Sequence, residues 1–188
     1  MPTTRSTEAS SHKGSAHNQV INMLKDDHAR VRKAFGDFDK LDVFEDSEQC
    51  MELVEQTCGE LEVHTALEEE LFYPAARAAL DEADLVDEAE VEHMTAHMLM
   101  DQIKDMEPEE EKYAATFKVL GEYVKHHLKE EEDEMFPRLA KSKLDWDGLL
   151  RQMTERRQQL IAELMPEALP AAEGVGKAKP KGKSQDKT

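Results

Sequence analysis

The chain has 188 residues, of which 39% are hydrophobic and 35% are charged, and its formal net charge is −18. This length suits one domain with a sizeable core. We find no apolar run long enough for a membrane span and no secretory signal, so we expect a cytoplasmic protein with no membrane partner. Because negative charge repels phosphate backbones, we also expect no nucleic-acid partner. Cys50 and Cys58 lie too far apart on one predicted helix to bond to each other, and we expect both to be reduced.

Both ends of the chain lack periodic apolar residues. Residues 1–17 are mostly small and polar, and we predict a disordered N-terminal tail in which His12 and His17 are exposed. Residues 166–188 are rich in Pro, Ala, Gly and Lys, which predicts a flexible basic tail.

Four segments between the tails carry apolar residues at every third or fourth position, as on one face of an α-helix. We predict helices over residues 18–41, 47–80, 84–106 and 108–140. Short links between them favour an all-α fold, an up-down-up-down antiparallel four-helix bundle over residues 18–141. A fifth amphipathic segment within residues 142–165 predicts an additional C-terminal helix, either packed on the bundle or making a dimer contact.

Two prolines give local expectations. Pro74 is expected to kink or loosen the second helix near its end, because it lacks a backbone donor. The apolar stripe of that helix is predicted to continue through Leu71 and Ala75. Pro108 is followed by three acidic residues, and we expect it to begin the fourth helix.

One pattern occurs twice in the chain. In each copy a histidine is followed four residues later by a glutamate, and an aromatic residue and a proline close the segment. Positions four apart lie on the same helix face, so each copy places an imidazole beside a carboxylate. A looser histidine segment precedes each copy, which gives two helical hairpins of one design. The copies contain His64/Glu68 and His127/Glu131, and the preceding histidines are His28 and His93.

These polar residues occupy positions of the apolar stripes and should point into the bundle. His97 flanks the stripe one turn from His93, whereas His126 is expected to face outward. Buried charges that lack partners are costly. Either a fully hydrogen-bonded polar layer or bound cations must therefore compensate. The predicted inward set is His28, His64, Glu68, His93, His97, His127 and Glu131.

The ligand types narrow the choice of metal. Imidazole and carboxylate without thiolate disfavour Cu(I) and iron–sulfur clusters, and oxygen-only Ca²⁺ or Mg²⁺ sites would not need so many histidines. Iron, manganese and zinc remain. Seven side chains exceed the four of a tetrahedral zinc site and fit two ions that share the carboxylates.

These residues resemble the hemerythrin family, in particular the bacterial HHE cation-binding domains. The resemblance covers residues 20–141. It rests on Asp27-His28, on His64 and Glu68 before Leu71-Phe72-Tyr73-Pro74, on Glu92-His93, and on His127 and Glu131 before Met135-Phe136-Pro137. It implies two non-haem iron ions with an oxo or hydroxo bridge, in preference to manganese or zinc. His28 and His64 would bind one ion, and His93, His97 and His127 the other, with Glu68 and Glu131 between them.

Two departures from the family pattern matter. Animal hemerythrins place an Asp five residues after the last His, where this chain has Glu132; the internal repeat instead selects Glu131. Many HHE proteins lack a histidine at the position of His97, and an outward His97 would leave one ion with an open position.

The resemblance implies a protein that binds dioxygen or a similar small diatomic for storage, delivery or sensing. The alternative is a redox-active di-iron enzyme or stress factor that reacts with peroxide or nitric oxide, or that donates iron for cluster repair. We expect a monomer or weak homodimer, in which the fifth helix or the basic tail could bind a partner.

Overall fold

The computed structural model describes residues 15–80 and 84–168, and these form helices and turns with no strand among them. Four long helices dominate: α1 (Ala16–Phe38), α2 (Ser47–Leu67), α4 (Asp84–Lys104) and α5 (Tyr113–Glu130). Short π-helical segments, η1 (Glu68–Phe72) and η2 (Glu131–Met135), join α2 to α3 (Tyr73–Ala79) and α5 to α6 (Phe136–Leu139). The helix α7 (Trp146–Leu164) and the 3₁₀ turn η3 (Pro166–Ala168) follow.

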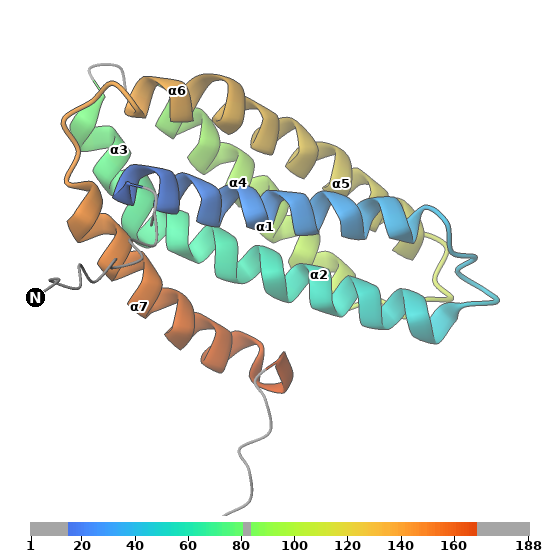
Figure 1. Ribbon diagram of the computed structural model, residues 1–188. Helices are drawn as coiled ribbons and strands as arrows, with labels where there is room; N and C mark the ends of the chain where they lie inside the picture. Colours follow the sequence, from blue (N-terminus) through green and yellow to red (C-terminus); the bar gives the residue numbers. More distant parts are fainter. Residues whose placement is uncertain (1–14, 81–83, 169–188) are drawn as a thin grey trace, which may run out of the picture.

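The four long helices lie side by side, and α7 lies outside them against α1 and α2 (Figure 1). Their buried stripes form two apolar clusters. One cluster includes Leu24 and Leu67, and the other includes Val31 and Leu61. The buried histidines and glutamates of the predicted inward set lie on the helices between these two clusters. Apolar packing therefore separates them from both ends of the helices.

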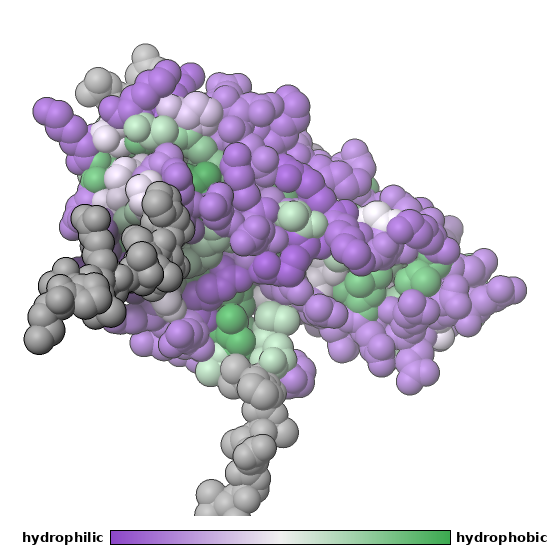
Figure 2. Space-filling model, in the orientation of Figure 1, coloured by the Kyte–Doolittle hydropathy of each residue, from purple (hydrophilic) through white to green (hydrophobic). Residues whose placement is uncertain are grey.

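The surface in the space-filling view is mostly hydrophilic, as expected for a chain with 35% charged residues (Figure 2). Among the described residues, no helix is long and apolar enough to cross a membrane. The helix α7 buries Leu149, Met153 and Leu160 and so packs as an amphipathic helix.

Two helix starts differ from the prediction. The first helix begins at Ala16, where the side chain of Ser15 accepts a hydrogen bond from the Asn18 amide. His17 is therefore not an exposed tail residue: it is partly buried in α1, and its ring meets the edge of Trp146 with centroids 4.6 Å apart. The prediction missed this start because the contact comes from α7, far along the chain. Residues 1–14 and 169–188, which include His12 and most of the basic tail, lie outside the described residues.

The fourth long helix begins at Tyr113, not at Pro108. Residues 107–112 instead form turns, in which the carbonyl of Glu107 accepts the Glu110 amide and the carbonyl of Glu110 accepts the Tyr113 amide. Proline and acidic residues suit turns as well as helix starts, so the composition alone did not decide between them.

Both copies of the sequence pattern contain a π-helical turn that ends two residues before the proline. The carbonyl of Glu68 accepts the amide of Tyr73, five residues later, and the carbonyl of Glu131 accepts the amide of Phe136. Pro74, like its counterpart in η2–α6, cannot donate the next helical hydrogen bond, and a wider turn accommodates the missing donor. The expected distortion near Pro74 therefore takes this form, and each turn begins at a glutamate of the inward set.

The extra residue in the turn shifts the buried face by one position. Leu71 and Ala75, which were predicted to continue the stripe of the second helix, are only partly buried. Phe72 and Ala76 are completely buried in their place. A π turn holds more residues than an α turn, so an α-helical period read through Pro74 gives the wrong face.

Candidate metal centre

Six of the seven predicted site residues meet in the core. They come from all four long helices and the two π-helical turns, and each is at most 5% exposed. The helical period explains the inward direction, because each histidine replaces an apolar residue of a stripe. The six are His28, His64, Glu68, His93, His127 and Glu131.

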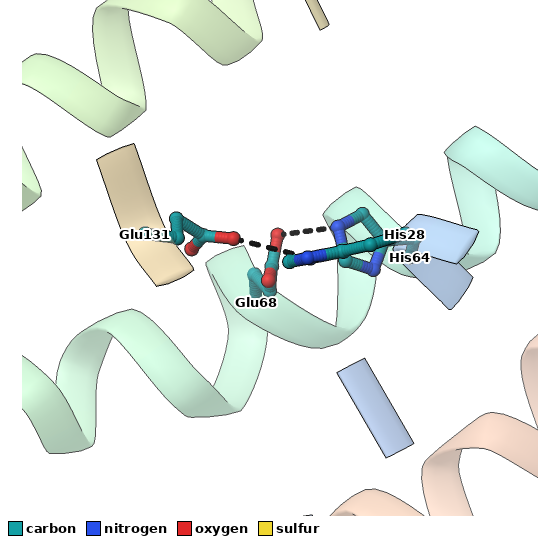
Figure 3. A group of neighbouring side chains, drawn as sticks. All are labelled: His28, His64, Glu68 and Glu131. Atoms are coloured by element: carbon teal, nitrogen blue, oxygen red, sulfur yellow. Dashed lines mark ion pairs between the residues drawn. The ribbon is translucent and has the colours of Figure 1, made fainter. Parts of the chain in front are cut away.

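The first group of ligand atoms joins α1 and α2 to the two glutamates (Figure 3). One ligand atom each from His28, His64, Glu68 and Glu131 lies within 4.8 Å of the others. Nε2 of His28 is 3.3 Å from Oε2 of Glu131, and Nε2 of His64 is 3.1 Å from Oε2 of Glu68. The four side chains point toward one another from separate elements, as Figure 3 shows.

A second group lies next to the first and shares Glu68 with it. It consists of Glu68, His93 and His127, again with ligand atoms within 4.8 Å of one another. Nε2 of His93 is 3.5 Å from Oε2 of Glu68, and Nε2 of His127 is 3.8 Å from Oε2 of Glu131. Both glutamates therefore stand between the two pairs of histidines.

Each of these histidines turns its other ring nitrogen toward a carboxylate. Nδ1 of His28, His93 and His127 lies 2.8, 2.9 and 2.8 Å from Glu132, Glu69 and Glu92. Nδ1 of His64 faces Asp27 at 3.6 Å. Carboxylates behind histidines fix the ring orientation and make the inner nitrogen a better metal ligand. The inner nitrogen of all four histidines is Nε2.

Burial and neighbouring charges shift the pKa values of groups in the cluster. Burial, followed by the neighbouring charge of Glu131, raises the pKa of Glu68 well above its usual value. Burial also lowers the pKa of His64 to about 4, which keeps this imidazole neutral at physiological pH. Metal binding requires neutral imidazole and ionised carboxylate. Bound cations would favour that ionised state of Glu68.

Several polar atoms of the cluster have no hydrogen-bond partner among the described residues. They are Nε2 of His28, both ring nitrogens of His64, Oε1 of Glu68 and Oε2 of Glu131. Buried polar atoms are nearly always satisfied in folded proteins. Nε2 of His28 and of His64 lies 3.3 and 3.1 Å from a carboxylate oxygen, but not in hydrogen-bonding geometry. The described side chains therefore do not satisfy one another as a complete hydrogen-bonded layer would. The unsatisfied atoms fit metal ions as their missing partners.

Tyr73 also belongs to the cluster, although the sequence reasoning gave it no role. It is completely buried, and its hydroxyl lies 3.0 Å from Nε2 of His93 and 3.3 Å from Nε2 of His127. The hydroxyl donates to Oε1 of Glu131 at 3.1 Å. Burial, then Glu131 and Glu68, raise the pKa of Tyr73 well above its usual value, so the hydroxyl keeps its proton. In the sequence, the only feature that singles out Tyr73 is its position directly before Pro74 in the repeated pattern.

His97 stands apart from the six. Its side chain is 40% exposed, and Nε2 lies 3.0 Å from Oε1 of Glu69, the carboxylate behind His93. The geometry also separates Glu131 from Glu132, because Glu131 faces the centre whereas Glu132 contacts the outer nitrogen of His28. His126 is exposed and lies beside Glu130 at the surface.

Comparisons with known proteins agree with this arrangement. The family model for the hemerythrin HHE cation binding domain matches residues 19–139. The crystal structure of a hemerythrin HHE cation binding domain-containing protein from Mycobacterium kansasii is similar in fold, with a TM-score of 0.63 and 23% sequence identity. The similarity covers 76% of this chain and 86% of that one. No curated protein matches the chain. The family model spans well over half of the sequence, and the chain therefore belongs to the hemerythrin family of HHE cation-binding domains.

Proposed function

We propose that this protein holds two iron ions and binds dioxygen or a similar small diatomic molecule for storage, delivery or sensing. His28 and His64 would bind one ion and His93 and His127 the other, with Glu68 and Glu131 shared between them. The observation that carries this proposal is the position of the two glutamates between two pairs of histidines, with buried polar atoms left unsatisfied. Four imidazoles and two carboxylates suit iron.

The topology belongs to the same proposal. Four consecutive long helices would form an up-down-up-down antiparallel bundle, with α7 as the additional C-terminal helix. Contacts between α1 and α2 and between α4 and α5 support it, as do the directions of the coloured ribbons in Figure 1. Helices from opposite directions can then supply ligands at one level of the core.

With iron bound, the centre supplies two adjacent redox-active ions to which a small molecule can bind. The protein's own part is to orient the ligands, exclude bulk water and hold a proton on Tyr73 Oη beside them. A small cavity of about 10 Å³ borders His64, His93 and His127 and is otherwise lined largely by apolar side chains such as Leu61 and Val124. By the same measure one water molecule needs at least about this volume, so the cavity leaves no room for a substrate larger than a very small molecule.

The second candidate function is a di-iron enzyme or stress factor that reacts with peroxide or nitric oxide, or donates iron for cluster repair. A first observation in its favour is that His97 is 40% exposed and directed at Glu69, which leaves the His93 side with two histidines. Fewer protein ligands leave more positions open at an ion. The buried proton donor Tyr73 also suits chemistry that consumes protons.

The experiment that tests the function is aerobic purification with iron quantitation and an absorption spectrum, followed by reduction and renewed exposure to air. A carrier or sensor is expected to contain about two iron ions per chain and to regain its spectrum over repeated cycles. Irreversible bleaching, or catalytic loss of added peroxide, would favour the enzyme. Protein without bound metal would contradict both candidates.

A further inference from the structure

The additional helix α7 is attached to the bundle by an ion pair that reaches the interior. Arg157 donates from Nη1 and Nη2 to both carboxylate oxygens of Asp27, at 2.6 and 2.5 Å. Asp27 is 3% exposed, and the Arg157 side chain is 22% exposed. A planar guanidinium that binds both oxygens fixes the orientation of a carboxylate as well as its charge. The orientation of Asp27 thus depends on a residue outside the four long helices (Figure 1).

Asp27 also contacts a proposed metal ligand. Its Oδ2 lies 3.6 Å from Nδ1 of His64, and the opposite nitrogen of that ring, Nε2, faces Glu68 at 3.1 Å. This contact is longer than the 2.8 and 2.9 Å contacts behind the other three histidines. At 3.6 Å this is a charge contact and not a hydrogen bond, and Nδ1 of His64 has no hydrogen-bond partner in the described part of the chain. A carboxylate that is held in place at this distance can still orient the ring through its charge.

A second arginine touches the same carboxylate but is less suited to hold it. Arg30 contacts Oδ1 of Asp27, yet its side chain is 47% exposed, and its Nε is shared with Glu60 at 3.2 Å. It also binds only one of the two oxygens. Arg157 contacts both oxygens and is the more buried of the two cations.

We propose that Arg157 is a positioning residue for the metal centre: by holding the Asp27 carboxylate behind His64, it lets α7 set the orientation of one ligand. This inference rests on the proposed function, since it assumes that His64 binds a metal ion. It assigns α7 a role at the centre through a residue that is not one of the six proposed ligands. Loss of Arg157 should weaken the binding of the ion held by His28 and His64. The affinity for the ion held by His93 and His127 should stay unchanged.

The chain offers a matched control in the adjacent residue. Arg156 also joins α7 to the rest of the protein through both oxygens of one carboxylate, at 2.6 and 2.9 Å from Glu70. The Glu70 side chain is 43% exposed and has no contact with a histidine of the centre. Arg156→Gln therefore removes a comparable contact of α7 without touching Asp27. Arg157→Lys keeps the charge at the tested position but loses the planar fork.

The test is a titration of the metal-depleted full-length protein with cobalt(II) against a competing chelator, followed by visible absorption. Wild type and Arg156→Gln are expected to bind two ions alike. Arg157→Gln should lower the affinity for one of the two ions by about 10- to 100-fold, which is the loss typical when a residue that supports a metal ligand is removed. The absorption bands of the cobalt at that site should also change. Arg157→Lys should lie between. In the Asp27→Asn background, Arg157→Gln should cause no further loss.

Equal affinities and spectra for Arg157→Gln, Arg156→Gln and wild type would overturn the inference. Additive losses in the double variant would do the same, because they would show that Arg157 does not act through Asp27. Helical circular dichroism of each metal-free variant separates unfolding from loss of the ion, and Arg157→Lys serves as the readout if Arg157→Gln fails to fold. Wild type that binds no cobalt would refute the metal centre itself, so the two failures are distinguishable.

Discussion

The two sides of the centre support their histidines in different ways. Behind His28 and His64, the outer carboxylates are held by arginines. Arg32 lies 2.7 Å from Glu132, and Arg157 binds Asp27 through both oxygens. We call this the arginine side. Arginine keeps its charge at every physiological pH, so each of these carboxylates has a permanent partner.

Behind His93 and His127, the outer carboxylates face other histidines. Nε2 of His97 lies 3.0 Å from Glu69, and Nε2 of His126 lies 3.9 Å from Glu92. Both of these outer histidines are substantially exposed. We call this the histidine side. Its outer carboxylates contact solvent-accessible imidazoles instead of fixed cations.

The difference shows how one repeated design can yield two unlike sites. The proposed inner ligands come in matching His–Glu pairs, because the sequence pattern repeats. The residues behind them are not, and α7 adds an arginine to one side only. We expect the arginine side to be the more tightly positioned half, whereas the histidine side is the more open one and also contains Tyr73.

The largest expected effect is the loss of both ions. It would remove any difference in metal binding between the arginine side and the histidine side. Glu68 belongs to both groups of ligand atoms. Glu68→Gln should therefore lower the affinity for both ions. The loss should exceed the roughly 10- to 100-fold that is typical when a residue behind a metal ligand is removed. Iron quantitation after gel filtration measures the result. Glu70→Gln, an exposed change in the same π-helical turn, is the control, and equal iron in both variants would show that Glu68 is not a shared ligand.

The metal-free protein should show the cost of burying Glu68 as a dependence on pH. The pKa of Glu68 in the folded protein is raised above the usual value of 4.5. Protonation of this carboxyl therefore stabilises the folded state, and the stabilisation is fully present below pH 4.5. That effect is lost as pH rises toward the folded-state pKa, at about 1.4 kcal/mol per pH unit. Urea unfolding of metal-free wild type and Glu68→Gln from pH 5 to about pH 8 measures it. Wild type should lose stability relative to the variant as pH rises, and parallel curves would contradict the assignment.

The outer carboxylates give a direct comparison of the two sides. Glu132→Gln leaves Arg32 without its partner 2.7 Å away, so an uncompensated cation would remain behind His28. Glu92→Gln on the histidine side leaves no such charge. We expect each change to lower the affinity for the ion on its own side, by about 100-fold for Glu132→Gln and about 10-fold for Glu92→Gln. Chelator competition measures both affinities. The opposite order would show that fixed charge does not distinguish the sides.

Tyr73 sharpens the comparison because the second copy of the pattern has Phe136 at the same place. Tyr73→Phe should keep both ions and cost about 1 kcal/mol of stability, the usual net value of a hydrogen bond. The absorption spectrum and the rate of recovery after reduction should change, because a proton donor beside both ions is gone. An unchanged spectrum and rate would mean that the hydroxyl only fills space.

The smallest effect is expected at His97. Because this side chain is 40% exposed and contacts the outer carboxylate Glu69, His97→Gln should retain both ions and change stability by less than about 0.5 kcal/mol. Iron quantitation and thermal melting measure these effects. Loss of one ion would show that His97 is a ligand, as animal hemerythrins imply, and that it turns inward when metal binds.

Much of the centre could be predicted because helical period carries direction. His28, His64, His93 and His127 each occupy a position in an apolar stripe, and all four are buried. Tyr73 could not be placed in this way. It lies five residues after Glu68, and in an α-helix it would point about 140° away. The π-helical turn brings it to the same face, and a simple period does not reveal such a turn.

The outer carboxylates were also beyond sequence reasoning. Asp27 and Glu92 stand next to His28 and His93 in the sequence, yet they serve His64 and His127 on other helices. Pairings between helices depend on how the bundle packs. The contact of Arg157 with Asp27, which are 130 residues apart, depends in addition on where α7 docks.

The central claim is that bound metal compensates for the buried acids and imidazoles, and thermal melting before and after iron removal tests it most directly. At a thousandfold excess over the dissociation constant, a ligand stabilises by about 4 kcal/mol. For a chain of this size, that corresponds to about 8–16 °C in Tm. We predict a fall of this order on iron removal and recovery when about two ions per chain are restored. An unchanged Tm in fully metal-depleted protein would contradict the account.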